Sequence, residues 1–390
     1  MNADERRCAL ALSRMGYHNI TVLRELYNAW GSMADIVKQH AHPEQLAPNM
    51  PERLLAAFAH TDEHLKRADE EMRFAQDNNI SIITLADEAY PQRLKACFDA
   101  PLALFFKGNA NLNAKHCISI VGTRKATPYA ADCIAQLTAR LKQLCPDILI
   151  VSGLAYGVDI MAHRQAIDHA LPTVAVLAHG LDTLYPTRHR KEATLMMQNG
   201  GLLTEYFSQS KIDKRNFLQR NRIVAGMSAA TLLVESAEHG GGLVTCRLAQ
   251  SYQHDVFAFP GSINNPYSVG CNRLIRDNVA GLVTSAEDIL KAMAWEEDIK
   301  ETVATNGASS NAVSSMGASV LGATSASTAK VPNGAQSVLD VLTKENDLHI
   351  DIIATRAGLP VNKVLALLFQ LEMSGMVSSL SGGRYHKVNS

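Results

Sequence analysis

Residues 231–250, TLLVESAEHGGGLVTCRLAQ, contain the pattern that best indicates the fold of this chain. An apolar run ends at a glutamate and a glycine-rich turn, and a segment with the apolar spacing of a helix follows. A buried strand followed by a helix is the repeating unit of a parallel sheet. Glycines at such a turn let backbone N–H groups approach an anion, which the N-terminus of the helix also attracts. The stretch therefore predicts a βα unit whose turn could hold phosphate.

The same pattern recurs between residues 80 and 285. Short apolar runs rich in Val and Ile recur, and most of them end in Gly or Ser, as buried parallel strands do. The runs are ISIITL (80–85), CISIVG (117–122), ILIVSG (148–153), TVAVLAHG (173–180), LLTEY (202–206), TLLVES (231–236), VFAFPG (256–261) and GLVTS (281–285). Segments with the length of crossover helices fall between them, at 127–144, 156–170, 189–199 and 243–253. Repeated units of this kind predict an α/β fold with a Rossmann-like, doubly wound, mainly parallel sheet.

A helical domain and a linker flank the predicted sheet domain, which we place at 79–295. Apolar residues recur at mostly helical spacing along 1–78, which predicts a small N-terminal helical domain. Residues 303–334 contain little besides small and polar side chains, which cannot bury enough apolar surface to order themselves. We therefore predict a flexible linker over 296–334.

Residues 335–390 have the pattern of a winged helix, which is a helix–turn–helix followed by a hairpin. A short helix at 349–357 and a longer helix at 361–374 precede two short strands. The longer helix carries only Asn362 and Lys363 as obvious contacts for DNA. A DNA-binding role and a protein-docking or purely structural role are therefore both open for this domain.

The composition excludes several classes of protein. Lys and Arg number 37 against 38 Asp and Glu, so the net charge of −1 excludes a uniformly basic nucleic-acid coat but not a local basic patch. No apolar run approaches the length of a membrane span and no signal peptide is recognisable, so we expect a cytoplasmic protein without a membrane partner. Seven scattered cysteines without a CxxC pair indicate reduced, mostly buried thiols. We expect neither a metal site nor a cofactor.

Four of the predicted strand ends combine glycine with polar groups. These ends carry Gly122, then Ser152, Gly153 and Gly157, then Gly240, Gly241 and Gly242 with Thr245, and finally Gly261. The carboxyl ends of parallel strands share one edge of a sheet, where ligands bind. Neither GxxxxGK[ST] nor GxGxxG with a following acidic residue is present, so ordinary nucleoside triphosphate or NAD binding is disfavoured. Four glycine turns at one edge predict adjacent phosphate sites, which suit the backbone of a polymer.

Basic and aromatic residues gather near the same edge. Arg124 and Lys125 follow the first glycine turn, and Arg188 lies beyond the third parallel strand. Arg220, Asn221 and Arg222 open an apolar helix, and we expect Arg124 and Arg222 to face the strand ends without a buried partner. The run Lys211 to Arg215 is more simply a solvated face. The aromatic residues near this edge could stack on bases or pack in the core or rim: Tyr129, Tyr156, Tyr185, Phe217 and Tyr267.

Acidic candidates for catalysis are few at this edge: Asp159, Asp182, Glu205 and Glu235. They provide no pair of carboxylates close in sequence, and no Ser/His/Asp spacing is present. The edge is suited to holding phosphates, and we expect no enzymatic activity.

At these motifs the chain resembles the DNA-processing protein A (DprA/Smf) family. The matching stretches lie in order between about 85 and 285: YPQRLKACFDAPLALFFKGN, ISIVGTRKATPYA, VSGLAYGVDIMAH, HGLDTLYPTRHR, FLQRNRIVAGMS, GGGLVTCRLAQ, VFAFPG and GCNRLIRDNVAGLV. The resemblance implies a Rossmann-like domain that binds single-stranded DNA and forms homodimers. It also implies a mediator that loads the RecA recombinase during natural transformation.

The resemblance carries the family's phosphate-contacting motifs onto residues of this chain. They fall on Gly122, Arg124, Ser152, Gly153, Gly157, Arg220, Asn221, Arg222, Gly242 and Thr245, and the later motifs contain Gly261, Asn272 and Arg273. From their charge and position, Lys125 and Arg188 join this candidate DNA-binding set.

Two other classes of protein are weighed against a DNA-binding mediator. Nucleotide-processing enzymes of the lysine-decarboxylase-like type also place a glycine-rich turn near a glutamate, and such an enzyme would use Glu235. Those enzymes have a PGGxGTxxE stretch with the glutamate after the glycines, whereas Glu235 precedes them here. A transcription regulator acting through the winged helix would need a basic recognition helix, and 361–374 is nearly uncharged.

Overall fold

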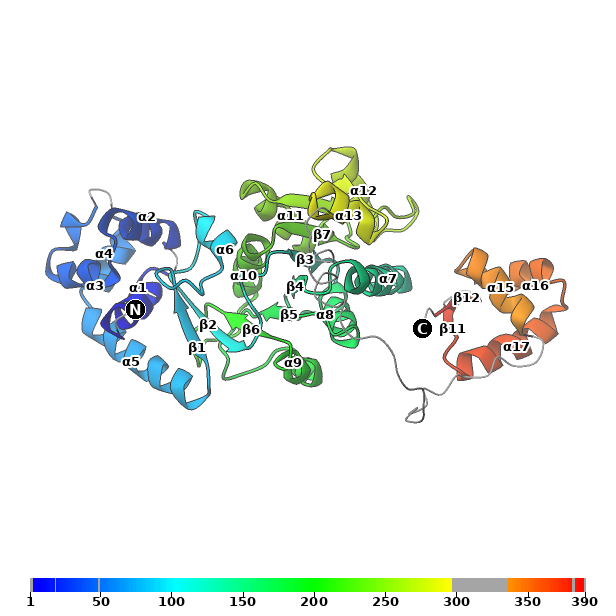
Figure 1. Cartoon of the computed structure of the whole chain (residues 1–390), viewed down its shortest axis with the longest axis horizontal. Helices are drawn as coiled ribbons and strands as arrows, with labels where there is room; N and C mark the ends of the chain where they lie inside the picture. The colour runs from blue at the N-terminus through cyan, green and yellow to red at the C-terminus, as the bar shows by residue number, and fades with distance from the viewer. Residues whose placement is uncertain (1–2, 18, 48–49, 297–334, 381–382, 389–390) are drawn as a thin grey trace, which may run out of the picture. The chain divides into compact units, whose positions relative to one another are not determined.

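The computed structural model describes residues 3–17, 19–47, 50–296, 335–380 and 383–388 (Figure 1). The chain divides into two compact units, Met1–Val303 and Ala304–Ser390. The predicted linker, 296–334, lies outside the described residues except for Glu296.

The described N-terminal residues form a helical head, residues 3–77. Its α-helices are α1 (Ala3–Met15), α2 (Ile20–Trp30), α3 (Met33–Lys38), α4 (Glu52–Phe58) and α5 (Thr61–Asp77). Leu10 and Leu54 of the head share one apolar core with Leu104 of the sheet. The helical head and the sheet therefore lie in one compact unit, and the predicted domain boundary after residue 78 stays a prediction.

A mixed sheet of nine strands in the described residues has the order β1-β2-β6-β5-β4-β3-β7-β8-β9. The strands are β1 (Ser81–Thr84), β2 (Ala103–Gly108), β3 (Cys117–Val121), β4 (Leu149–Ser152), β5 (Thr173–Val176), β6 (Gly200–Thr204), β7 (Ala230–Leu233), β8 (Asp255–Ala258) and β9 (Gly281–Leu282). All pairs formed among the seven strands β3, β4, β5, β6, β7, β8 and β9 are parallel, which confirms the mainly parallel sheet. The prediction of a parallel strand at 80–85 is wrong, because β1 pairs antiparallel with β2. Strand β2 itself was not predicted, and it pairs antiparallel with β6.

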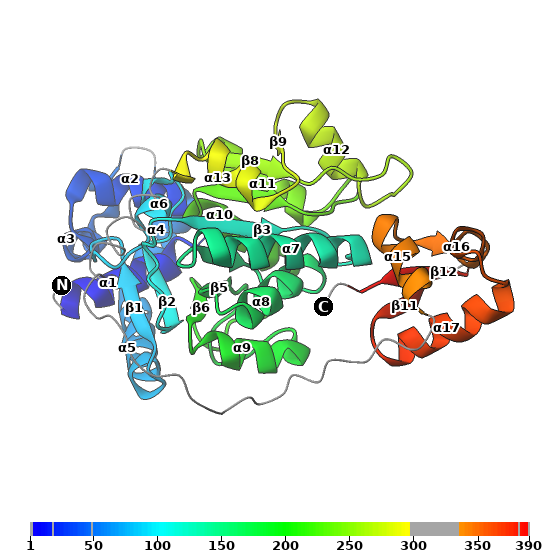
Figure 2. The same cartoon turned by 45° about the vertical axis from the view of Figure 1, so that its right-hand side comes forward.

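Helices cover both faces of the sheet, as a doubly wound fold requires. They are α6 (Gln92–Ala96), α7 (Pro128–Leu144), α8 (Val158–Asp168), α9 (Arg190–Met196), α10 (Lys214–Met227), α11 (Gly241–Ser251), α12 (Val269–Arg276) and α13 (Ala286–Ala292). Alternate residues of β3 enter different cores: Ile118 and Ile120 pack with α7 and α8, whereas Cys117 and Val121 belong to the core that contains α10 and α11. Helices α7 and α8 lie side by side on one face (Figure 2).

The order of the strands creates a switch point between β3 and β7. From β3 the chain steps to β4, β5 and β6 in one direction, and α10 then returns it to β7 on the other side of β3. The connections that leave β3 and β7 therefore diverge, and a crevice opens at the carboxyl ends of these two strands.

The second unit contains α15 (Gln336–Lys344), β10 (Leu348–His349), α16 (Ile350–Ala357), α17 (Val361–Met373), β11 (Val377–Leu380) and β12 (Arg384–Lys387). The three strands form an antiparallel sheet, and the helices pack on it through a separate apolar core. This order agrees with the predicted helix–turn–helix and hairpin, to which the structure adds β10. Among the described residues, no single helix is long and apolar enough to cross a membrane, although the bent pair α16 and α17 passes that test when the two are joined.

Candidate functional site

A cavity of about 680 Å³ opens at the switch point, and we call it the strand-end cleft. The turns after β3, β4 and β7 line one side of it, with Gly122, Gly153 and Gly240–Gly242 among their residues. Ile212, just before α10, and the N-terminal part of α10 between Lys214 and Asn221 supply further lining residues. Three of the four predicted glycine turns therefore meet in one cavity, whereas Gly261 does not line it.

Close backbone packing explains the glycines of the first two turns. Thr123 donates its backbone N–H to the carbonyl of Glu235 (2.8 Å) and accepts the N–H of Val158 (3.1 Å), which ties the turns of β3, β4 and β7 together. Gly157 has a φ of +78°, and a Cβ there would overlap the carbonyl oxygen of Thr123. A side chain at Gly157 would therefore force the turns apart.

The triglycine stretch starts α11 and points the N-terminus of this helix at the strand-end cleft. A Cβ at Gly242 would lie 3.1 Å from Cα of Gly122, so the first turn of α11 sits directly against the turn of β3. The first N–H groups of a helix have no partner within the helix and attract anions. The turns of β3 and β7 can therefore bind a phosphate at their shared edge.

Arg220 is a buried cation beneath this edge. Its Nη1 donates to the carbonyl oxygens of Gly153 (2.6 Å) and Val176, and a Cβ at Gly153 would overlap the guanidinium. Burial lowers the pKa of Arg220, and the carboxylate of Asp159 opposes this effect. Arginine stays charged in proteins, so Arg220 fixes the turn after β4 and places a positive charge at the base of the strand-end cleft.

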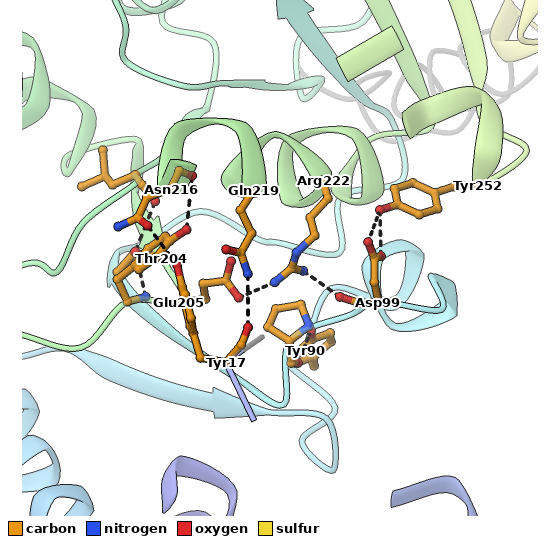
Figure 3. Close-up of polar contacts among 12 residues, drawn as sticks. Tyr17, Tyr90, Asp99, Thr204, Glu205, Asn216, Gln219, Arg222 and Tyr252 are labelled. Atoms are coloured by element: carbon orange, nitrogen blue, oxygen red, sulfur yellow. Dashed lines mark hydrogen bonds and ion pairs between the residues drawn. The ribbon is translucent and has the colours of Figure 1, made fainter. Parts of the chain in front are cut away.

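Arg222 points to the other side of α10, and the prediction that it faces the strand ends without a buried partner is wrong. It is 5% exposed, forms an ion pair with Glu205, and donates from Nη1 to the carbonyl of Asp99 at 2.7 Å (Figure 3). Residues two apart on a helix differ by about 200° in direction, so Arg220 and Arg222 cannot face the same cleft.

The rim of the strand-end cleft combines cations with exposed apolar side chains. The guanidinium carbon of Arg124 lies 5.5 Å from the ring centre of Phe217, and the rings of Phe217 and Tyr185 meet edge to face at 5.8 Å. Tyr185 is 44% exposed and Leu218 is 55% exposed. Lys214, which the sequence assigns to a solvated face, also lines the cleft. A basic rim with accessible aromatic rings can contact both the phosphates and the bases of a single strand.

The other predicted site residues divide into three groups. Ser152, Thr245, Asn272 and Arg273 bond to backbone carbonyls of the protein, those of Ile120 (2.6 Å), Gly241 (3.1 Å), Gly261 (2.9 Å) and Glu238 (3.0 Å) respectively. Asn221 lines the strand-end cleft and its Nδ2 lies 3.4 Å from the carbonyl of Gly241. Lys125 and Arg188 are exposed but do not line the strand-end cleft.

Glu235 acts as a structural residue at the start of α7. Its carboxylate accepts the backbone N–H of Thr127 (2.9 Å) and the hydroxyl of the same residue (2.7 Å), and its side chain is buried. Both carboxylate oxygens are therefore bonded to the residue that precedes α7. This geometry disfavours the reading of Glu235 as a catalytic base. Among the residues that the structure describes, no group of three or more His, Cys, Asp or Glu could hold a metal ion.

The fold defines the chain as a Rossmann-like protein with a helical head and a second, winged-helix unit. Residues 81–294 match the family model of the DNA recombination-mediator protein A, and residues 322–383 match that of the DprA winged helix domain. The chain therefore belongs to the DNA recombination-mediator protein A (DprA/Smf) family. The names and titles in this family describe DNA processing and recombination and assign no enzymatic activity.

Relatives and solved structures agree with this assignment. Protein Smf of Escherichia coli is 32% identical over 323 residues, which cover 82% of this chain and 80% of the relative. The X-ray structure of DNA processing protein A from Streptococcus pneumoniae is 30% identical and covers 72% of this chain and 95% of its own, with a TM-score of 0.62. A structure of DNA processing protein A from Helicobacter pylori is 29% identical, covers 56% of this chain and 96% of its own, and has a TM-score of 0.50. Its title describes a single-stranded DNA binding mode for that protein.

Proposed function

We propose that this chain binds single-stranded DNA in the strand-end cleft and acts as a recombination mediator. The observation that carries the proposal is the meeting of three glycine-containing strand-end turns with exposed aromatic and apolar side chains in one cavity. A small phosphorylated metabolite would need only one such turn in an enclosed pocket. The backbone of single-stranded DNA can contact several turns at once, while its bases stack on Tyr185 and Phe217.

In this proposal Arg124 and Lys214 hold phosphates and Phe217 stacks on a base. Arg124→Ala should weaken binding of oligo(dT) about tenfold to a hundredfold, because hydrogen bonds to charged groups contribute roughly 1.5–3 kcal/mol. It should also lower the salt slope by about 0.7, the value for one phosphate of a single strand. Phe217→Ala should lose about 1–3 kcal/mol of stacking without a change in slope.

The experiment measures the affinity of these variants for single- and double-stranded DNA at several salt concentrations. Lys291→Ala is the matched control, because Lys291 is an exposed cation on α13 outside the strand-end cleft. Wild-type affinity and slope in both Arg124→Ala and Phe217→Ala would show that DNA binds elsewhere.

The proposal extends to the assembly and the role of the protein. We propose that it forms homodimers through the Rossmann-like domain, acts in the cytoplasm, and loads RecA onto bound DNA during natural transformation. Family membership motivates these assignments, and Ile263, Val269 and Leu282 are exposed apolar side chains outside the strand-end cleft that such a dimer could bury. Ile263→Asp with Leu282→Asp should convert a dimer to a monomer in sedimentation. RecA filament assembly on DNA coated by a single-strand binding protein tests the loading step.

A further inference from the structure

A second cavity, of about 730 Å³, lies between the helical head and the sheet, and we call it the head cleft. Arg14 and Tyr17 line it from the helical head, and the turn Phe207–Lys211 and the start of α10 line it from the sheet domain. Figure 3 shows the polar contacts that join Tyr17 of the helical head to Asn216 and Gln219 of α10. Tyr17 donates its hydroxyl to Asn216 Oδ1 at 3.0 Å, and Arg67 donates to the carbonyl of Ser208 at 2.9 Å. The head cleft is therefore preformed.

The start of α10 is a ridge between the two clefts. Ile212, Lys214, Phe217 and Leu218 line the strand-end cleft, whereas Lys211, Asp213, Arg215, Asn216 and Gln219 line the head cleft. This division follows from the helical period, which turns successive residues by about 100°. A chain molecule that leaves the strand-end cleft across this ridge would enter the head cleft.

The head cleft carries an excess of positive charge. Of its two acidic lining residues, Glu205 is paired with Arg222. Asp213 accepts the backbone N–H of Arg215 at 2.7 Å as the cap of α10 and keeps its negative charge, which offsets one of the cations. Among the cations, Arg67 bonds to Glu71, whereas Lys211 and Arg215 are exposed at the ridge.

Arg14 adds a third accessible cation from the helical head. Its Nη1 lies 3.0 Å from Nδ1 of His64. Burial and the neighbouring guanidinium lower the pKa of His64, so the imidazole is neutral at pH 7 and leaves the positive charge of Arg14 unchanged. Three cations on two sides of one groove suit a phosphodiester backbone.

We propose that the head cleft is a second subsite for the same single strand of DNA, with its phosphates held by Arg14, Lys211 and Arg215. The proposal rests on the proposed function, because the strand reaches the head cleft from the strand-end cleft. It gives the helical head a direct role in DNA binding. Oligomers that only fill the strand-end cleft do not use the head cleft, and longer oligomers gain affinity from it.

The test compares a length series of oligo(dT) on the full chain. Arg14→Ala with Arg215→Ala should leave the affinity for the shortest bound oligomer unchanged and remove the gain of the longer ones. The loss for long oligomers should be about tenfold for each cation, with a fall in salt slope of about 1.4 for two phosphates. Arg53→Ala with Arg73→Ala is the control, because both arginines are exposed on the helical head outside both clefts.

The outcomes separate this proposal from the proposed function. If the wild-type protein binds no oligomer, the strand-end cleft fails as a DNA site and the head cleft fails with it. If short oligomers bind and the Arg14 and Arg215 variant retains the full gain with length, only the head cleft is refuted. An equal loss in the Arg53 and Arg73 control would also refute it, because the effect would then be nonspecific. Unchanged melting temperatures of both variants establish that the losses are not unfolding.

Discussion

At the scale of single residues, α10 shows how a step of two residues along a helix separates two roles for arginine. Arg220 points toward the strand-end cleft and bonds to backbone carbonyls, whereas Arg222 points away from that cleft and pairs with Glu205. In the sequence, residues 220–222 (RNR) place both arginines in an otherwise apolar helix, which indicates that each has a polar partner or ligand. It does not identify their partners, since Glu205 and Asp99 come from distant parts of the chain.

Arg222→Ala should destabilise the protein instead of acting on DNA binding alone. The substitution leaves the Glu205 carboxylate buried without its partner, which costs roughly 3–5 kcal/mol. Denaturant unfolding measures the loss. Glu205→Ala in the same chain should recover part of it, because the unpaired charge is then absent. An Arg222→Ala protein with wild-type stability would contradict a structural role for this pair.

His163 on α8 should make the protein sensitive to acid. It is fully buried, its Nδ1 bonds to Thr173 Oγ1 at 2.8 Å, and its Nε2 has no partner among the described residues. The Thr173 hydroxyl donates to the carbonyl of Ile150, so it accepts from His163 Nδ1, and Nε2 is the unprotonated nitrogen. Burial lowers the pKa of His163 from 6.5 to about 3.

The sign of the pH effect follows from this lowered pKa. Above pH 6.5 the folded and unfolded states both hold a neutral imidazole, and as the pH falls toward 3 only the unfolded state takes up the proton. Stability should therefore fall with decreasing pH in this window, by at most about 1.4 kcal/mol per pH unit. His163→Asn keeps a donor for Thr173 and should reduce this slope in unfolding measurements at a series of pH values. An unchanged slope would contradict the assignment.

At the scale of elements, Glu235 links the end of β7 to the start of α7. Glu235→Gln should lower the free energy of unfolding by about 1–2 kcal/mol, because an amide has a single acceptor oxygen for two Thr127 donors. Glu238→Gln, the same change at an exposed position three residues later, should leave the free energy of unfolding unchanged. Neither variant nor the wild type should hydrolyse nucleoside monophosphates. Turnover that Glu235→Gln abolishes would instead favour the enzyme hypothesis.

The elements also show which parts of the fold could be predicted from sequence. Except for β6, whose run LLTEY ends at Tyr206, each parallel strand corresponds to an apolar run closed by Gly or Ser. The four predicted crossover helices correspond to α7, α8, α9 and α11. The orientation of β1 could not be predicted, because a local run of apolar residues contains no information on its pairing partner. The strand-end cleft was predicted through its glycines, whereas Lys214 was assigned to a solvated face because its position on the rim depends on how α10 returns to the sheet.

At the scale of the whole molecule, the helical head is fixed to the sheet by both apolar and polar contacts. Helix α1 packs against β1 and β2, and Glu71 of α5 accepts the backbone N–H (2.8 Å) and the hydroxyl (2.6 Å) of Ser208 after β6. A head held in this way can form one wall of a preformed cleft. It should also unfold together with the sheet.

Leu10→Ala tests this cooperativity. Leu10 is fully buried in the core that joins the helical head to the sheet, so its truncation should cost about 2–5 kcal/mol. The chain has two tryptophans, Trp30 on α2 of the helical head and Trp295 beside the sheet. Trp295→Phe leaves Trp30 as the fluorescent reporter of the head, and Trp30→Phe leaves Trp295 as the reporter of the sheet.

In a cooperative unit, Leu10→Ala should shift the thermal transitions of both reporters to the same lower temperature, because the sheet loses the packing energy of the head. Arg53→Ala, at an exposed position of the helical head, should leave the thermal transitions of both tryptophan reporters unchanged. A shift confined to Trp30, with Trp295 melting at the wild-type temperature, would mean that the helical head is a separate domain, as the sequence predicted for residues 1–78. The head cleft would then lie between two independently folding domains, and its geometry would depend on their docking instead of on a shared core.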